Sequence, residues 1–457
     1  MRADLVVRGG TVVTDGWSGP VDVVVADGRV AALVEPGSVR AADEVDASGR
    51  VVVPGGVDPH CHVGFTSGDF TSLDDHRQCT TAAVAGGTTT IVDFAIPRPG
   101  QAPADVAALQ RAKAPEGLCD SALHASVVEW DGTTAEQLRQ LADEGLRTVK
   151  MFTTYRGETM ADEDTFLRVM KTLGPLGGMV IAHCEANHLI EEQQAEQAAA
   201  GRISAAHHHE TRPELAEDAS VAQVLAIAES LGTPVYFVHQ STPTAVDLVA
   251  TARRQGVRAH SEAVAHHLTL DDGVYGGAHP ERFVCCPPLR PAATVRELGT
   301  RLVSGAIDTV GSDHCCYDTA QKTTIDSDVR LMPNGLPGVE TRLVVVQDAF
   351  VRTGLLSWER FVEVTAAAPA RLNGIYPRKG SLLPGSDADI AVWDPAAART
   401  ITTAGLHMAT DYTPYEGREV RGWPTTVLVG GHVVVDGSQV VDDTARGRHL
   451  PAAPLRW

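Results

Sequence analysis

Val53-Pro-Gly-Gly-Val-Asp-Pro-His-Cys-His62 is the stretch around which this chain is organised. A short apolar run leads through a Pro/Gly turn to His60 and His62, which are two residues apart. In a β-strand, residues two apart point to the same face, so both imidazoles can reach one metal ion. A single pair of this kind is more often two ordinary half-buried histidines, so its meaning depends on the residues further along the chain.

Strand-like apolar runs alternate with helical patterns through the middle of the chain. The strand-like runs cover residues 57–63, 90–96, 125–130, 148–153, 179–184, 235–239, 257–261 and 309–314. Helical patterns between them include residues 134–144, 163–173 and 219–231. This alternation predicts the α/β fold class, as a (β/α)₈ TIM-like barrel. A doubly wound open sheet is the alternative, but we find no GxGxxG motif or P-loop in its support.

The two ends of the chain carry Val-rich runs of another kind. Residues 5–13 and 21–34 form β-branched segments with a hairpin turn at Asp27-Gly28. Residues 388–394 and 425–436 repeat this pattern near the other end. We therefore expect both ends to pair into one small β-sandwich domain, residues 1–52 plus 380–440. The barrel would span residues 53–379, and residues 441–457 would form a C-terminal tail.

The composition limits the classes of partner. Of 457 residues, 43% are hydrophobic and 21% charged, and the formal net charge is −20. This charge argues against nucleic acid and anionic membranes as partners. No run of 18 apolar residues predicts a transmembrane helix, and the first residues lack a signal-peptide core. The eight cysteines contain no CxxC motif and indicate reduced thiols in the cytoplasm.

Two stretches without periodicity, residues 195–217 and 316–340, are predicted to be long loops. Loops after barrel strands frequently carry function. His207, His208 and His209 lie in the first stretch. Three consecutive histidines cannot all face one point, so a solvated loop is expected there.

Metal-ligand residue types recur at the ends of the predicted strands. They are His60 and His62, Lys150, His183, His239 and Asp313. Strand ends of a barrel converge on one mouth, and nitrogen and oxygen ligands of this kind suit Zn²⁺. An ammonium repels cations, so Lys150 fits only as a carbamate formed with CO₂, which could bridge two ions.

The sequence resembles the dihydropyrimidinase/hydantoinase family, cyclic amidohydrolases of the amidohydrolase superfamily. The matching pieces are PGGVDPHCH (54–62), GGTTTIVDF (86–94), VKMFTTYRG (149–157), HCEANHLI (183–190), RPELAEDAS (212–220), CPPLR (286–290), TVGSDHC (309–315), NGLPGVETR (334–342) and DYTPYEGREVRG (411–422). They span most of the chain, and the combination is specific.

The resemblance implies two divalent metal ions, usually zinc. His60, His62 and Asp313 would hold one ion, His183 and His239 the other, with N6-carboxylated Lys150 as the bridge. A hydroxide shared by the ions would attack the amide of a hydantoin or dihydropyrimidine ring, with Asp313 as general base and then general acid.

The resemblance also suggests which residues contact the substrate. Tyr155 would stabilise the oxyanion, and Cys286 and Asn334 would hold the imide of the ring. Phe65 and Phe70 lie on the loop expected to face the ring substituent, which favours an apolar group there. A homo-oligomer, a tetramer or a dimer, is expected as well.

The sequence departs from the family at several points. Cys61 stands where Thr is usual, Cys286 stands where Ser is usual, and segments 64–70 and 260–267 are atypical. An allantoinase-like or other cyclic ureide hydrolase is the alternative activity. Dihydroorotases have an Arg shortly after His-x-His, and here residues 63–67 contain none. A non-catalytic dihydropyrimidinase-related scaffold is a third alternative, although such relatives lose ligands that this chain keeps.

Overall fold

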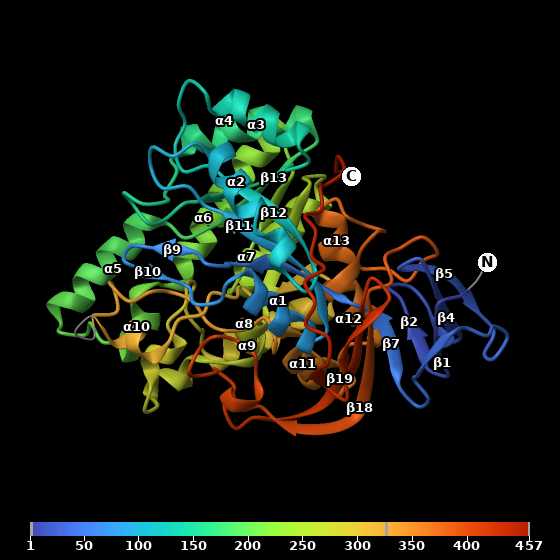
Figure 1. The fold of residues 1–457 in the computed structure, drawn as a ribbon. Coiled ribbons are helices and arrows are strands. Elements are labelled where there is room, and N and C mark those ends of the chain that lie inside the picture. The colour runs from blue at the N-terminus through green and yellow to red at the C-terminus, as the bar shows by residue number, and fades with distance from the viewer. Residues whose placement is uncertain (1–2, 325–327, 456–457) are drawn as a thin grey trace.

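A ring of eight parallel strands lies at the centre of the computed structural model, which describes residues 3–324 and 328–455 (Figure 1). The strands are β8 (Gly56–Cys61), β11 (Thr88–Ala95), β12 (Asp120–Ser126), β13 (Thr148–Phe152), β14 (Met179–His183), β15 (Val235–Phe237), β16 (Ala259–Val264) and β17 (Thr309–Gly311). Each pairs with its neighbour in chain order. The ring closes where Cys61 bridges His314 and the amide of His62 donates to the His314 carbonyl at 2.7 Å. The predicted barrel is therefore confirmed.

All eight predicted strands are present, although their bounds differ. The largest error concerns β12, which was expected at residues 125–130 and occupies Asp120–Ser126. Every residue of β12 is buried, polar ones included. His124 lies fully inside, with Nδ1 on the Thr148 hydroxyl at 2.7 Å and Nε2 on the Pro59 carbonyl at 3.1 Å. Satisfied polar groups of this kind hide a buried strand from a search for apolar runs.

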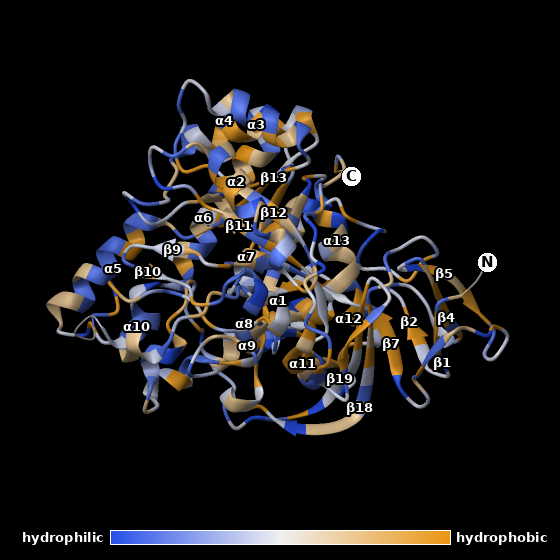
Figure 2. Ribbon diagram, viewed as in Figure 1, coloured by the Kyte–Doolittle hydropathy of each residue, from blue (hydrophilic) through white to orange (hydrophobic). Residues whose placement is uncertain are grey.

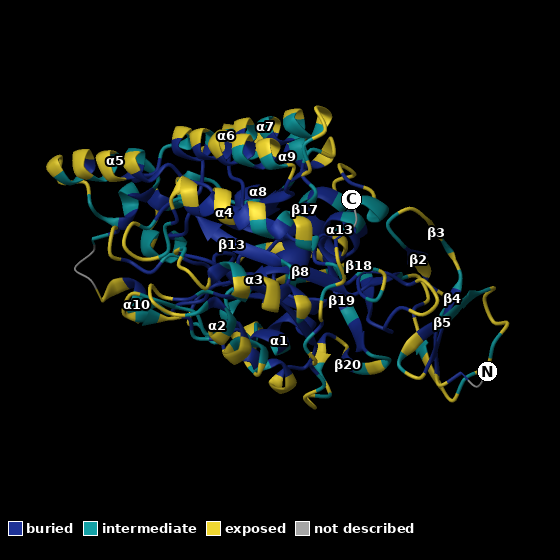
Figure 3. Ribbon diagram, turned by 90° about the horizontal axis from the view of Figure 1, so that it is seen from above, coloured by how far each residue is buried: buried dark blue, intermediate teal, exposed yellow. Residues whose placement is uncertain are grey.

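Helices surround the ring of strands. They are α1 (His76–Ala85), α2 (Pro103–Arg111), α3 (Thr134–Asp143), α4 (Glu163–Leu173), α5 (Asn187–Ala199), α6 (Glu214–Leu231), α7 (Pro243–Arg254), α8 (Ala265–Thr269), α9 (Ala292–Val303), α10 (Thr319–Thr323), α11 (Arg342–Val346), α12 (Trp358–Val362) and α13 (Ala368–Leu372). The outer helices expose one side and bury the other against the strands (Figure 3). The colours of α3 and α4 alternate between hydrophilic and hydrophobic in the same way (Figure 2).

Two smaller sheets lie beside the barrel, and the larger one combines strands from both ends of the chain (Figure 1). One sheet has the order β5-β4-β1-β6, and the other has the order β21-β20-β19-β18-β7-β2-β3. Their bounds are β1 (Leu5–Arg8), β2 (Thr11–Val13), β3 (Ser18–Pro20), β4 (Asp22–Ala26), β5 (Arg29–Val34), β6 (Asp43–Asp46), β7 (Val51–Pro54), β18 (Ile390–Thr400), β19 (Glu419–Val429), β20 (His432–Asp436) and β21 (Gln439–Val440). Residues from both ends share one apolar core, including Val7, Val23, Ile390 and Leu428. The division into domains at residues 52, 379 and 440 stays a prediction.

The C-terminal segment runs along the amino-terminal ends of the barrel strands. The Leu450 amide donates to the Ser121 carbonyl at 2.8 Å, and the Ala452 amide donates to Gly145 at 2.8 Å. Further along, the Leu455 amide donates to Gly177 at 3.1 Å. These contacts lie at the end of the barrel opposite the predicted ligands.

The first predicted loop is largely helical, so that expectation was wrong. Residues 195–217 contain the end of α5, the 3-10 helix η3 (Ala205–Thr211) and the start of α6. His208 is also buried, and its Nε2 bonds to the Cys285 carbonyl at 2.7 Å. The second stretch, 316–340, contains α10, and its residues 325–327 lie outside the described part.

The eight cysteines are all buried and free. No helix within residues 3–324 and 328–455 is long and apolar enough to cross a membrane.

Candidate metal centre

The predicted ligands meet at the carboxyl ends of the barrel strands. Lys150 lies within β13, and His183 ends β14. His239 and Asp313 each follow the end of a strand, β15 and β17, by two residues. Lys150, His183, His239, Asp313 and His62 line one cavity of about 380 Å³, with His60 buried behind it. The structure thus brings together all six residues that the sequence singled out.

His60, His62 and Asp313 form a tight triangle of potential ligand atoms. Nε2 of His60 lies 2.9 Å and Nε2 of His62 lies 3.3 Å from Oδ1 of Asp313. The two ring nitrogens are 3.2 Å apart. An ion placed just above a triangle of this size would lie about 2 Å from all three atoms, the usual distance in zinc sites.

The protonation of this triangle follows from its charges. Burial lowers the pKa of His62 to about 4, which leaves its imidazole neutral and able to ligate. Although burial lowers the pKa of His60, Asp313 and Glu262 raise it to about 9. Burial would raise the pKa of Asp313, but the charge and hydrogen bond of His60 hold it well below its ordinary value. The carboxylate therefore stays ionised.

His183 and His239 form the second pair. Their ring centroids are 4.5 Å apart, and those of His60 and His239 are 5.4 Å apart. His183 bonds Glu185 through Nε2 at 2.8 Å, which leaves Nδ1 free to ligate. Burial lowers the pKa of both imidazoles, so both are neutral.

Lys150 is fully buried between two aromatic rings. Its Nζ lies 5.0 Å from the Phe94 centroid and 4.9 Å from the Phe152 centroid. Within the described part of the chain, Nζ has no hydrogen-bond partner. Burial lowers the pKa of Lys150 to about 8, so a sizeable share of the amine is neutral near physiological pH. A neutral, desolvated amine is the form that reacts with CO₂.

The site fits a pair of divalent ions. Nδ1 of His239 and Nζ of Lys150 are buried without a partner among the described residues. Unsatisfied polar atoms are costly in a protein interior, and ligation or carboxylation would satisfy both of these. Imidazole nitrogens with one carboxylate are donors that zinc accepts.

Backbone strain marks the same place. Tyr155, His239 and Asp313 have φ angles of 69°, 40° and 50°, in the left-handed region that non-glycine residues rarely adopt. Such conformations cost about 1–3 kcal/mol each and gather at functional sites. They turn these side chains into the barrel mouth immediately after their strands end.

Two buried carboxylates that the sequence reading missed orient the histidines. Oε1 of Glu262, in β16, lies 2.8 Å from Nδ1 of His60 and accepts from the His239 amide at 3.0 Å. Glu185 holds His183 and pairs with Arg212. Metal-binding histidines commonly donate their other ring N–H to a carboxylate in this way. The single acid in the buried run 261–265 and the His-x-Glu spacing at 183–185 were the available signals.

The predicted substrate contacts fall into two groups. Tyr155, Cys286, Asn334 and Phe65 line the cavity beside the ligands. Phe70 is not among the described residues that line it. The cavity lining also contains charged side chains that the sequence reading did not foresee, namely Asp69, Arg98 and Glu158.

A closed barrel with these ligands at its mouth defines a metal-dependent hydrolase. The chain belongs to the amidohydrolase family, whose model matches residues 51–434.

Within that family the chain is similar to enzymes of one kind. It is 36% identical to the dihydropyrimidinase of Rattus norvegicus, over 99% of this chain and 89% of the relative. It is 35% identical to the D-hydantoinase of Ralstonia pickettii, over 98% of each chain. The solved dihydropyrimidinase of Brevibacillus agri superposes with a TM-score of 0.96 at 32% identity, over 99% of each chain. The predicted family is confirmed, and the protein is a hydrolase that acts on cyclic amides.

Proposed function

We propose that this protein opens hydantoin or dihydropyrimidine rings by hydrolysing a ring amide. The observation that carries the proposal is the convergence of His60, His62, Lys150, His183, His239 and Asp313 on one cavity. Similarity to dihydropyrimidinases and D-hydantoinases over nearly full length supports this choice of ring.

His60, His62 and Asp313 would hold one divalent ion, and His183 and His239 a second. Carboxylated Lys150 would lie between the two. Ions held there, for which the donors favour zinc, supply Lewis acidity and lower the pKa of water towards neutrality.

Two side chains, Asp313 and Tyr155, would then transfer or donate protons during the reaction. Asp313 accepts a proton from the attacking water and passes it to the leaving ring nitrogen, because its carboxylate is ionised and lies at the mouth. Tyr155 donates its O–H to the oxyanion that develops on the amide carbonyl. Burial raises the pKa of Tyr155 well above its ordinary value, so the proton needed for this hydrogen bond is retained.

The cavity also constrains the substrate. Cys286 and Asn334 lie where they could hold the imide edge of a flat ring. Phe65 and Ile96 form an apolar part of the cavity wall, which we expect to face the ring substituent. An apolar wall favours apolar substituents over charged ones. Arg98 is exposed in the same lining, so an anionic substituent is the sharpest challenge to this preference.

A substrate panel on metal-replete protein tests the proposal. It should contain hydantoins and dihydrouracils with neutral and anionic substituents, together with allantoin and dihydroorotate. We expect the highest kcat/KM on a hydantoin or dihydropyrimidine with an apolar substituent. Much faster turnover of allantoin or dihydroorotate would overturn the choice of ring, and no turnover of any cyclic amide would favour a scaffold.

We further propose a homo-oligomer, a tetramer or a dimer, which light scattering on purified protein would measure. Eight buried free thiols favour a reducing compartment such as the cytoplasm.

A further inference from the structure

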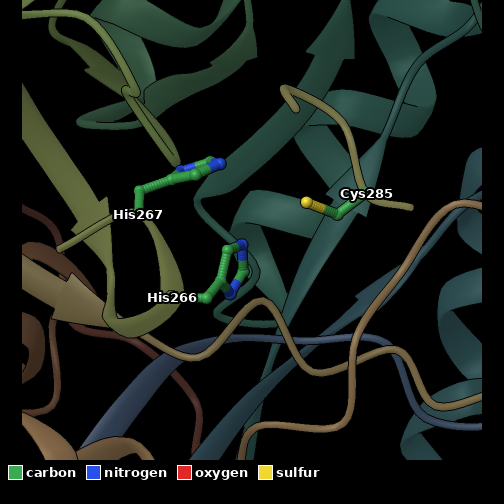
Figure 4. A group of neighbouring side chains, drawn as sticks. All are labelled: His266, His267 and Cys285. Carbon is green, nitrogen blue, oxygen red and sulfur yellow. The ribbon is translucent and has the colours of Figure 1, made fainter. Parts of the chain in front are cut away.

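Two adjacent histidines and a cysteine form a further buried group of potential metal ligands (Figure 4). His266 and His267 lie in α8, immediately after β16, and Cys285 comes from the segment that precedes Cys286. Their exposed fractions are 4%, 2% and 1%. One potential ligand atom from each lies within 4.8 Å of the others. The atypical segment 260–267 noted in the sequence contains both histidines.

Two polar atoms of this group contact the same backbone oxygen. Nε2 of His267 lies 3.0 Å from the Pro287 carbonyl, and the Cys285 thiol donates to the same carbonyl at 3.3 Å. Nε2 of His266 and Nδ1 of His267 are buried with no hydrogen-bond partner in the described structure. Two unsatisfied imidazole nitrogens beside a thiol are costly unless a ligand is bound there.

A second group of potential ligands, with an aspartate in place of one histidine, behaves differently. In Asp74, His314 and Cys316, Nε2 of His314 lies 2.7 Å from an Asp74 oxygen. Nδ1 of His314 accepts from the Gly338 amide at 3.1 Å, and the Cys316 sulfur accepts from the Asp74 amide at 3.4 Å. Hydrogen bonds within the protein thus satisfy both ring nitrogens of His314 without a ligand. In the His266 group, by contrast, two ring nitrogens have no hydrogen-bond partner among the described residues.

We propose that His266, His267 and Cys285 bind one thiophilic divalent cation, such as zinc, as a site separate from the catalytic pair. Two imidazoles and a thiolate are three donors of a tetrahedral zinc site, and the Pro287 carbonyl lies beside them. On binding, the Cys285 S–H bond breaks, a sulfur–metal bond forms and the proton leaves to solvent. The positive charge of neighbouring Arg290 is offset by Glu217 at 3.5 Å.

The site would be structural and would act on the substrate cavity. It would tie the end of β16 to the segment that holds Cys286, which lines the cavity. His208 already holds that segment through the Cys285 carbonyl at 2.7 Å. The proposal does not depend on which ring the enzyme opens.

Cobalt substitution of the full chain separates this site from the catalytic pair. The catalytic ligands contain no sulfur, so a near-ultraviolet thiolate-to-cobalt charge-transfer band would report a cysteine ligand. We expect this band in the wild-type chain, its loss in Cys285→Ser and its retention in the matched variant Cys316→Ser. Zinc analysis should show one fewer equivalent per chain in Cys285→Ser than in the wild type.

Several results would overturn the proposal. They are no charge-transfer band in the wild type, a band that survives in Cys285→Ser, or a band lost in Cys286→Ser but not in Cys285→Ser. If Cys285→Ser does not fold, His266→Gln replaces it. That variant must then lose the same equivalent of zinc and change the band, and an unchanged band and zinc content would refute the site.

Discussion

Two buried lysines at different places in the molecule are held in opposite ways. At the mouth, Lys150 has no hydrogen-bond partner among the described residues, and burial lowers its pKa to about 8. Where the barrel meets the small sheets, Nζ of Lys379 lies 2.8, 3.0 and 2.7 Å from oxygens of Asp120, Asp387 and Asp389. Although burial lowers it, these carboxylates raise the pKa of Lys379 above its ordinary value.

The contrast distinguishes a lysine that stabilises the fold from a lysine whose amine is reactive. Lys379 is a fixed cation shared by three aspartates, two of which also pair with Arg378 and Arg448, and it joins the start of β12 to the segment before β18. Lys150 is kept dry and unsatisfied, which costs stability and makes its amine reactive. Removing each lysine should therefore damage a different property.

Lys150→Ala should have the largest effect on catalysis. We expect kcat/KM to fall on the order of 10³-fold or more, equivalent to about 4 kcal/mol of transition-state stabilisation. At least one equivalent of metal should be lost, and short-chain carboxylic acids should partly restore both metal and activity. Steady-state kinetics and elemental analysis measure this, and a variant with full metal and full activity would refute the bridging role.

Lys379→Met should instead affect stability. It leaves three carboxylates without their shared cation, and breaking a buried ion pair costs about 3–5 kcal/mol. Denaturant unfolding should show this loss, while metal content and kcat of the folded fraction stay near wild type. Loss of metal at unchanged stability would break the distinction between the two lysines.

The candidate metal ligands could be predicted from the sequence, but the residues that orient them could not. A His-x-His pair or a His at a strand end is visible in the sequence because the barrel topology fixes where such residues meet. Glu262 and Glu185 were not predicted as functional residues. A single acidic residue within an apolar run has no evident role until the residue that it contacts is known. The unpartnered state of Lys150 Nζ depends on packing between Phe94 and Phe152, which no local pattern encodes.

Glu262→Gln should weaken metal binding at the barrel mouth, although it removes none of the proposed ligands. Glu262 orients His60 and the His239 backbone, and loss of such support typically lowers metal affinity or activity about 10–100-fold. Titration of the metal-free chain with zinc, competed by a chelator, measures the change. Affinity within about twofold of wild type would show that the carboxylate is not needed for positioning.

Phe65→Ala should leave metal content and the chemical step unchanged and alter only the choice of ring substituent. Phe65 lines the cavity, whereas Phe70 is not among the described residues that line it. Phe65 directly precedes the short hairpin of β9 (Thr66–Ser67) and β10 (Phe70–Thr71), and Phe70 lies within this hairpin. We expect a loss of roughly 1–3 kcal/mol in discrimination between apolar and charged substituents for Phe65→Ala, mainly in KM. Phe70→Ala is the matched control, and equal effects of both variants would place Phe70 against substrate as well.

The proposed metal centre depends on carboxylation of Lys150, which would let this residue hold two divalent ions together. The direct measurement is ¹³C NMR of enzyme rebuilt from the metal-free chain with zinc and ¹³C-bicarbonate. The account predicts a carbamate carbon signal that rises with activity in the wild type and is absent from Lys150→Ala. Fully active, metal-loaded enzyme that shows no carbamate signal would contradict it.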